Sequence, residues 1–305
     1  MSELEAQFGN AVARFRYPDA KMFRSIIDSL SDIIEEAAFT ITKDGVKVSG
    51  LDPAKVAYVE VTIPYSSFLE YELSQDSVTM GANLASLSKA LVDTKKGNSV
   101  EFRVSQSQVL IKVEGQARRV YLLPNIEVAS EVPEMKLEHD ADIKIMADPF
   151  RRAVEDAGEF GNAVELEATD TYFAVRASGD RRAEAKFLSG SGSLISLEVK
   201  EIAKAVYDYS YLDKVLSLAK VAEQVEVMFK TDNPLELRLD SPSFSVRYVL
   251  APYTGEAAGE EERTSGRSKK KEEAKEEAAE SEEAAEEGEE EEEGGEEEEG
   301  SSEEE

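Results

Sequence analysis

A helix followed by strands occurs twice in this chain, about 128 residues apart, and this repeat constrains the fold more than any other feature. The first copy runs from Asp19 to Gly50 and the second from Asp148 to Gly179. Phe23-Arg24 matches residues 150–151 at an offset of 127, and residues 48–50 match residues 177–179 at an offset of 129. Duplicated domains present similar surfaces that can be arranged around an axis. The repeat therefore favours a symmetric scaffold that holds another molecule over one that reacts with it.

The charge of the chain is unevenly distributed along its length. Residues 254–305 contain 25 Glu against 6 Lys plus Arg, a net charge of −19, within a total of −30 for the 305 residues. Acidic self-repulsion and the scarcity of aromatic and branched residues leave this segment unable to form a core. We expect a disordered acidic tail after a body that is long enough for two ordinary domains.

The residues needed for most enzyme chemistry are missing. The absence of cysteine excludes disulfides, thiolate catalysis and cysteine-type zinc sites. The one histidine, His139, lies among acidic residues and is expected at the surface. Neither a phosphate-binding loop nor a nucleophile elbow is present, and no apolar run approaches the length of a membrane span. We therefore expect no catalytic residues, no metal site and no cofactor, in an intracellular protein without a signal peptide.

Apolar periodicity predicts the elements of the first half. Pro18-Asp19 starts a helix whose apolar residues, from Met22 to Ile34, recur with a period near 3.6. Lys43-Asp44-Gly45 is a hairpin-turn signal between two strands within residues 38–48. Residues 83–92 form a second, shorter amphipathic helix. The remaining strands are expected at residues 10–17, 56–63, 99–104, 109–113 and 119–123.

The second half repeats this order. Asp148 is expected at the N-cap of a helix, with Pro149 in its first turn. Residues 200–220 are ambiguous by pattern alone, and fit one long helix or a strand at 204–209 followed by a helix at 210–220. The other strands are expected at residues 143–146, 163–168, 172–177, 184–188, 194–199, 225–230, 235–239 and 244–250. With the stretch split, each half has two helices and many strands, which is an α+β arrangement.

Two prolines bracket an irregular segment between the repeat copies, at Pro124 and Pro133. Such a segment is typical of a connection between domains. The predicted organisation is an N-terminal domain at residues 1–123, a connecting loop at 124–133, a C-terminal domain at 134–253 and the acidic tail at 254–305.

Lys and Arg residues occur on the outer face of every predicted helix or just beyond it. Acidic neighbours such as Asp28 and Glu155 fit an ordinary solvated helix face, and this interpretation stays open. The alternative is contact with DNA phosphates, which needs cations but no base readout and permits sliding. The nine candidate DNA-facing residues are Lys21, Arg24, Lys89, Lys95, Lys96, Arg151, Arg152, Lys214 and Lys220.

A short apolar segment, residues 248–252, comes directly before the acidic tail. It fits a final core strand, or one wall of a groove that binds a peptide. Apolar residues within the irregular connecting loop, Ile126, Val128 and Val132, indicate a second wall.

Three segments together resemble DNA sliding clamps of the proliferating cell nuclear antigen (PCNA) family, most closely archaeal ones. They are residues 45–53 (GVKVSGLDP), 83–89 (NLASLSK) and 248–252 (YVLAP), and the resemblance extends from about Ala11 to Pro252. It implies two duplicated clamp domains, each with two helices packed on antiparallel sheets, in a ring of three chains around duplex DNA. It also favours a strand followed by a helix within residues 200–220. Arg24, Lys89, Arg152 and Lys220 fall at or near DNA-facing positions of the family, whereas Glu155 stands where many relatives have a base.

The resemblance further implies a pocket for short peptides carried by a clamp loader, DNA polymerase, flap endonuclease and DNA ligase. The matching positions are Leu51, Tyr58, Val132, Pro234, Val249, Ala251 and Pro252. Subunits of the family join through edge strands paired head to tail, expected here near residues 108–113 and 183–187. The interface residues expected on these strands are Val109, Ile111, Val113, Ala183, Ala185 and Phe187.

The expected function is a processivity clamp for DNA polymerase and not an enzyme. Two alternatives are a subunit of a heterotrimeric or checkpoint-type clamp, and an acidic chaperone that acts through its tail. A further hypothesis is that the tail screens the ring from non-specific DNA. An archaeal clamp would be cytoplasmic and associated with the nucleoid, and a eukaryotic one nuclear.

Overall fold

The computed structural model describes residues 3–128, 135–179 and 181–254, without the side chains of Lys220 and Val221. Met1–Pro252 forms one compact unit. The acidic tail after residue 254 and the second part of the connecting loop lie outside the described residues, so the predictions made for them remain predictions.

The strands form three sheets, and every pair of neighbouring strands is antiparallel. The five-stranded sheet has the order β5 (Glu70–Leu73), β1 (Ala13–Tyr17), β7 (Ser99–Val104), β8 (Gln108–Glu114) and β9 (Arg119–Pro124). The four-stranded sheet has the order β13 (Glu184–Leu188), β12 (Tyr172–Ser178), β11 (Ala163–Ala168) and β15 (Ala203–Asp208). The nine-stranded sheet has the order β14 (Leu194–Val199), β10 (Ala141–Met146), β16 (Gln224–Phe229), β17 (Leu235–Asp240), β18 (Ser245–Leu250), β4 (Ala57–Pro64), β3 (Gly45–Leu51), β2 (Glu36–Thr42) and β6 (Ser77–Asn83).

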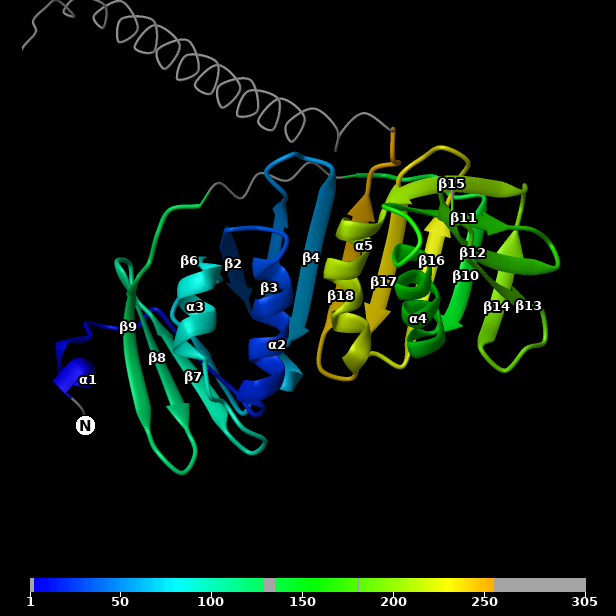
Figure 1. Ribbon diagram of the computed structural model, residues 1–305. Helices are drawn as coiled ribbons and strands as arrows, with labels where there is room; N and C mark the ends of the chain where they lie inside the picture. Colours follow the sequence, from blue (N-terminus) through cyan, green and yellow to red (C-terminus); the bar gives the residue numbers. More distant parts are fainter. Residues whose placement is uncertain (1–2, 129–134, 180, 255–305) are drawn as a thin grey trace, which may run out of the picture. The chain divides into compact units, whose positions relative to one another are not determined.

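The helices lie beside the sheets (Figure 1). They are α1 (Glu3–Gln7), α2 (Ala20–Ser31), α3 (Leu84–Ala90), α4 (Ala147–Gly158) and α5 (Tyr209–Leu216), with 3-10 turns η1 (Tyr65–Ser67) and η2 (Leu218–Val221). The α+β class with helices packed on antiparallel sheets is confirmed. Within residues 200–220, β15 is followed by α5 and η2, so the interpretation as one long helix is wrong and the split interpretation is confirmed.

The internal repeat is a repeat of topology. The order β5-β1-β7-β8-β9 in the first half corresponds to β14-β10-β16-β17-β18 in the second, and β4-β3-β2-β6 corresponds to β13-β12-β11-β15. The bounds of α2 and β3 each differ by 127 residues from those of α4 and β12, and β2 and β11 begin 127 residues apart. The sequence match of residues 48–50 to residues 177–179, at an offset of 129, is therefore shifted by two residues from the structural repeat. Strand β18 pairs with β4, so one continuous sheet joins the two halves.

The first repeat helix begins where its sequence predicts. The Asp19 carboxylate accepts hydrogen bonds from the backbone N–H groups of Lys21 and Met22, both at 3.0 Å, which satisfies two donors of the first turn. Phe23, Ile26 and Leu30 are among the buried residues of α2. The apolar stripe read from the sequence is thus the face that packs on the sheet.

The second repeat helix begins earlier than predicted. Helix α4 starts at Ala147 with Met146 at the N-cap, and Met146 makes no side-chain capping bond. The predicted N-cap role of Asp148 is wrong, because Asp148 lies inside the first turn. A carboxylate there still interacts favourably with the positive end of the helix dipole. Pro149 lies in the first turn, as predicted.

The predictions missed α1, β5 and β6. Strand β5 has the sequence EYEL, with exposed or half-buried residues throughout, and it is an edge strand held by pairing with β1. Strand β6 contains Gly81, which weakens any strand signal. Both strands are defined by pairing partners distant in sequence, which periodicity does not reveal.

Candidate functional site

Helices α3, α2, α5 and α4 lie side by side on one side of the sheets (Figure 1). The Ser88 hydroxyl of α3 donates to Asp28 Oδ1 of α2 at 2.5 Å. The hydroxyls of Ser29 in α2 and Ser217, just after α5, are also 2.5 Å apart. These bonds connect the helices of both halves into a single surface, which we call the helix row.

The cations of the first half are available for contact. Lys21, Lys89, Lys95 and Lys96 are exposed, and none forms an ion pair with another residue in the described part of the chain. Arg24 is the exception, because its Nε lies 3.2 Å from Asp28 Oδ2 one turn further along α2. The first half of the helix row therefore offers four lysines to an anionic partner.

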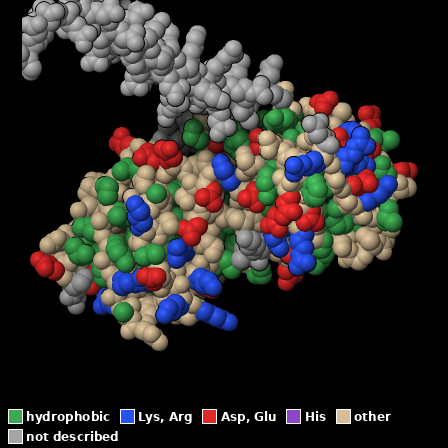
Figure 2. Space-filling model, in the orientation of Figure 1, with side chains coloured by type: hydrophobic (Ala, Val, Ile, Leu, Met, Phe, Trp, Pro, Cys, Tyr) green, Lys and Arg blue, Asp and Glu red, His purple; other side chains and the backbone are tan. Residues whose placement is uncertain are grey.

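The cations of the second half are largely neutralised. Arg151 donates to Glu155 at 2.6 Å and to Asp148 at 2.7 Å, and Arg152 lies 2.9 Å from Asp148. The hydrogen bond from Arg151 lowers the pKa of the Asp148 carboxyl, which stays ionised. The Lys214 ammonium lies 4.9 Å from the centre of the Tyr211 ring. Figure 2 shows acidic side chains next to basic ones over α4, and several Lys and Arg side chains along the lower edge of the first half.

The middle of the helix row is hollowed and acidic. A cavity of about 450 Å³ is lined by Asp32, Glu155, Tyr209, Ser210, Asp213, Lys214 and Ser217. Partial desolvation raises the pKa of Asp32; nearby Lys214 opposes this shift, while the charges of Asp28 and Asp213 add to it. Of the nine predicted DNA-facing residues, eight lie on or next to the helix row, and the side chain of Lys220 lies outside the described set.

Three of the residues predicted for the peptide pocket lie side by side on the nine-stranded sheet. Leu51 of β3 lies opposite Tyr58 of β4, and Tyr58 lies opposite Val249 of β18. The exposed fractions of Tyr58 and Val249 are both 5 %. The Tyr58 hydroxyl donates to Glu60 Oε2 at 2.6 Å, which satisfies the one polar atom of this row. Three predicted pocket residues thus form one apolar row across three strands.

The chain continues this apolar surface beyond β18. The N–H of Ala251 donates to the Val56 carbonyl at 2.8 Å, which extends the pairing with β4. Pro234 comes directly before Leu235, the residue that pairs with Leu250. Pro234, Ala251 and Pro252 are half-buried and lie at the end of β17 and β18 where Leu235 pairs with Leu250.

The connecting loop begins at the far edge of the same sheet. The N–H of Ile126 donates to the Gly81 carbonyl at 3.2 Å, and the N–H of Gly81 donates to Asn125 Oδ1 at 2.8 Å. A Cβ on Gly81 would clash with the Ile126 carbonyl oxygen, so this close approach requires glycine. Ile126 and Val128 therefore lie by β6, separated by β2 and β3 from β4. The position of Val132 lies outside the described residues.

Sequence reasoning missed the group that ties this surface to the helix row. Asp52 is 4 % exposed, and its carboxylate accepts hydrogen bonds from the N–H groups of Ala54, Val56 and Ala57. It also accepts from the Tyr211 hydroxyl of α5 at 3.0 Å. The Asp-Pro pair after β3 is a turn signal that could have identified the local cap, but not the contact with a tyrosine 159 residues away.

One predicted subunit edge is wrong. Strand β8 lies between β7 and β9, and Val109, Ile111 and Val113 are at most 2 % exposed. These three side chains fill the core, so they cannot form the expected interface. The two edge strands of this sheet are β5 and β9. The other predicted edge, at residues 183–187, is confirmed as an edge, because β13 ends its sheet.

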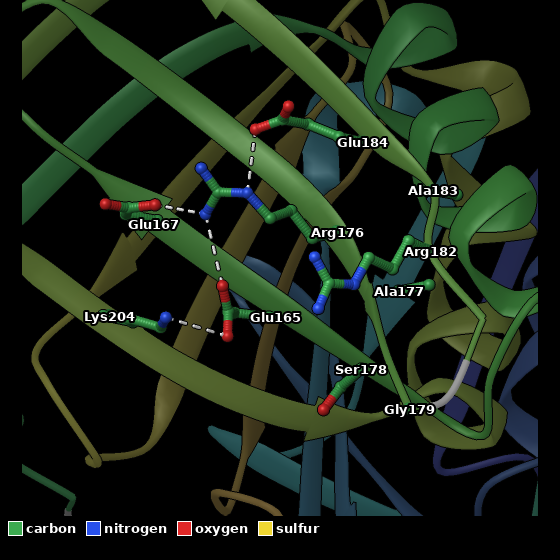
Figure 3. A pocket seen from close by; sticks show the side chains of 10 residues that line it. All are labelled: Glu165, Glu167, Arg176, Ala177, Ser178, Gly179, Arg182, Ala183, Glu184 and Lys204. Carbon is green, nitrogen blue, oxygen red and sulfur yellow. Dashed lines mark hydrogen bonds and ion pairs between the residues drawn. The ribbon is translucent and has the colours of Figure 1, made fainter.

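Charge clusters on the outer sheet faces are internally compensated. In the hollow of about 720 Å³ drawn in Figure 3, Arg176 points between Glu165, Glu167 and Glu184, while Lys204 pairs with Glu165 at 3.1 Å. His139 is half-buried, and burial lowers its pKa, which favours the neutral imidazole. Among the described residues no group of three His, Cys, Asp or Glu side chains could hold a metal ion. The ion pairs of Arg176 and Lys204 link neighbouring strands of the four-stranded sheet.

A duplicated α+β chain with four helices in one row, an apolar row of residues across the sheet that joins the halves, and edge strands at β9 and β13 has the architecture of the clamp proteins. Residues 12–140 match the family model described as "Proliferating cell nuclear antigen, N-terminal domain". DNA polymerase sliding clamp 1 of Aeropyrum pernix is 42 % identical over 247 residues, covering 79 % of this chain and 100 % of the relative. The clamp of Thermofilum pendens is 34 % identical over 245 residues, covering 79 % and 99 %. The chain belongs to the proliferating cell nuclear antigen family and is not an enzyme.

Solved structures confirm the fold. PCNA from Thermococcus kodakaraensis has a TM-score of 0.74 at 24 % identity, covering 79 % of this chain and 100 % of that chain. A PCNA2–PCNA3 complex from Sulfolobus tokodaii gives a TM-score of 0.73 at 23 % identity, covering 78 % and 98 %. In the described part of the chain, no helix is long and apolar enough to cross a membrane.

Proposed function

We propose that the protein is a DNA polymerase sliding clamp that assembles into a ring of three chains around duplex DNA. The observation that carries the proposal is the repeat of sheet topology. Strand β18 pairs with β4 inside the chain, while their counterparts, β9 and β13, both remain at free edges. Pairing β9 of one subunit with β13 of the next would satisfy both edges by the same geometry, and a head-to-tail joint of this kind must close into a ring.

The repeat also predicts the register of this joint. Tyr121 corresponds to Tyr248, and Ala183 corresponds to Val59, which pairs with Tyr248 inside the chain. We therefore place Tyr121 of one subunit opposite Ala183 of the next. In the same register Val120 lies opposite Glu184. The proposed interface thus keeps the predicted β13 strand and replaces β8 with β9.

The helix row supports the role of the ring in holding DNA. With β9 and β13 at the joints, each chain adds its helices to one continuous surface. Lysine side chains suit phosphate contact, which carries no sequence information and permits sliding. Among the described residues, the exposed and unpaired side chains of Lys21, Lys89, Lys95 and Lys96 are available for this contact. Topology rather than affinity would then keep the closed ring on DNA.

The apolar row of Leu51, Tyr58 and Val249, extended by Pro234 and Ala251, supports partner recruitment. A short peptide can bury an aromatic or aliphatic plug here and pair its backbone with a neighbouring segment. We propose that a clamp loader, DNA polymerase, flap endonuclease and DNA ligase bind through such peptides. The corresponding strands of the other repeat are taken up by the subunit joint, so each chain offers one groove. In an archaeal cell, this function places the clamp at the nucleoid in the cytoplasm.

The joint is tested by two substitutions at one position. Val120→Glu would set a like charge opposite Glu184 of the neighbouring subunit, whereas Val120→Lys would set an opposite charge there. We expect sedimentation to show a ring for the native chain and for Val120→Lys. On dilution, the ring of Val120→Glu should dissociate at a protein concentration at which the native ring is still intact. Equal masses for both variants at every concentration would refute the register, and a native chain that stays monomeric would refute the homotrimer.

A second candidate is a subunit of a heterotrimeric clamp. The solved PCNA2–PCNA3 complex of Sulfolobus tokodaii favours this candidate, as do the separate clamps 1 and 3 of Aeropyrum pernix among the relatives. The joint would use the same strands, with different chains supplying β9 and β13. A native chain that sediments as a monomer alone and forms a ring only with another clamp chain would support it.

A further inference from the structure

Helix α1 is an addition in front of the clamp fold. It spans Glu3–Gln7 and ends with a hydrogen bond from the Phe8 N–H to the Leu4 carbonyl at 3.1 Å. The match to the family model begins at residue 12, so α1 lies outside it. A five-residue helix is not stable by itself in water. Its stability must therefore come from the surface against which it packs.

That surface is a free edge strand of the five-stranded sheet. Helix α1 packs against β9, and Figure 1 shows it beyond β9, on the side away from β8. Glu5 is 7 % exposed, and its Oε1 lies 2.5 Å from Nη2 of Arg118, the residue directly before β9. A buried carboxylate is costly unless it is paired, so this ion pair holds α1 in place.

The position of α1 conflicts with the proposed joint. A helix is about 10 Å across with its side chains, whereas a paired strand lies about 4.8 Å from its neighbour. Both cannot occupy the same stretch of edge. Covering a free edge with a helix is also a common way to prevent strands of different molecules from pairing.

We propose that α1 is a latch that covers the β9 edge in the free subunit and must leave it before a second copy of this chain can dock. The edge thus has two competing occupants, α1 of the same chain and β13 of another. If the latch is closed in about nine of ten free subunits, each joint is weakened about tenfold. This inference rests on the proposed ring. It adds one step to ring assembly, the release of α1 from β9.

The test compares substitutions at two glutamates of α1. Glu5→Arg places a second cation at Arg118 and should open the latch, whereas Glu3→Arg makes the same charge change at an exposed position of the same helix. The dissociation constant of the ring is measured by sedimentation. We expect it to fall about tenfold per joint for Glu5→Arg and for deletion of residues 1–10. It should be unchanged for Glu3→Arg, and restored when Glu5→Arg is combined with Arg118→Glu.

A second measurement separates the latch from the ring. Hydrogen exchange at residues 119–123 is followed in protein dilute enough to be monomeric, where Glu5→Arg should speed exchange at least severalfold. If no variant forms a ring, the assembly proposal fails and the exchange rates alone decide on the latch. Unchanged exchange would overturn the latch. So would a weaker ring after deletion, because α1 would then be part of the joint.

Discussion

Glu101 provides a quantitative test of how the outer sheet face is stabilised. This carboxylate is 1 % exposed and pairs with Arg103 at 2.6 Å, Lys112 at 3.0 Å and Arg14 at 3.1 Å. Burial by itself raises the pKa of the carboxyl, but the hydrogen bonds from these three cations outweigh it and bring the pKa to about 2. The group is therefore ionised throughout the neutral range.

The pKa shift converts into a stability contribution. A fall from 4.5 to about 2 corresponds to about 3 kcal/mol of unfolding free energy, since one pKa unit is about 1.4 kcal/mol. The folded-state pKa is depressed, so this contribution is complete above pH 4.5 and is lost as the pH falls toward 2. Glu101→Gln should therefore destabilise the protein by about 3 kcal/mol at pH 7, and by about 1 kcal/mol or less near pH 2.5.

Urea unfolding of dilute protein at the two pH values measures this difference. The control is Glu72→Gln, which removes the same charge from an exposed position on the nearby strand β5 and should change stability by less than about 0.5 kcal/mol. A gap between native protein and Glu101→Gln that is the same at both pH values would refute the argument, because the loss would then come from packing and not from charge.

Three further predictions concern the proposed function. Lys89 and Lys95 are replaced with alanine, and DNA affinity is measured by fluorescence titration at several salt concentrations. The magnitude of the slope of log affinity against log salt should fall by about 0.9 for each phosphate that is no longer neutralised. The same change at Arg151 should alter the slope less, because Arg151 is already paired with acids. Ala251→Glu should weaken binding of a partner peptide at least about tenfold without changing the sedimenting mass. Unchanged peptide affinity would show that the peptide does not bind at this apolar row. Deleting residues 254–305 should raise DNA affinity at low salt, and an unchanged titration would rule out screening by the tail.

Local signals in the sequence identified many elements with accuracy. The first repeat helix starts at Pro18-Asp19 as predicted, because the Asp19 cap needs only backbone donors two and three residues away. Strands β11, β13 and β14 begin and end where alternation placed them. The second helix shows the limit of this approach. An aspartate followed by proline looked like a cap, but the pairing of β10 as far as Met146 sets the start of α4.

Some features of the functional surfaces were predicted from the sequence, and others became visible only in the structure. Residue type and helical period placed the cations on the helix row, but their ion pairs with Asp148 and Glu155 became visible only in the structure. Likewise, Leu51, Tyr58 and Val249 are far apart in the chain, and strand register aligns them in one row.

The sequence by itself determined the duplication, the α+β class and the kind of surface each helix presents, because these depend on periodicity and on residues close together in the chain. Only the tertiary structure decided which strands stand at the edges. Residues 109–113 and 119–123 both read as apolar strands, yet β8 pairs with a strand on each side and β9 pairs with a strand on one side. A strand becomes an edge through the absence of a neighbour, and that neighbour can come from any part of the chain or from another molecule.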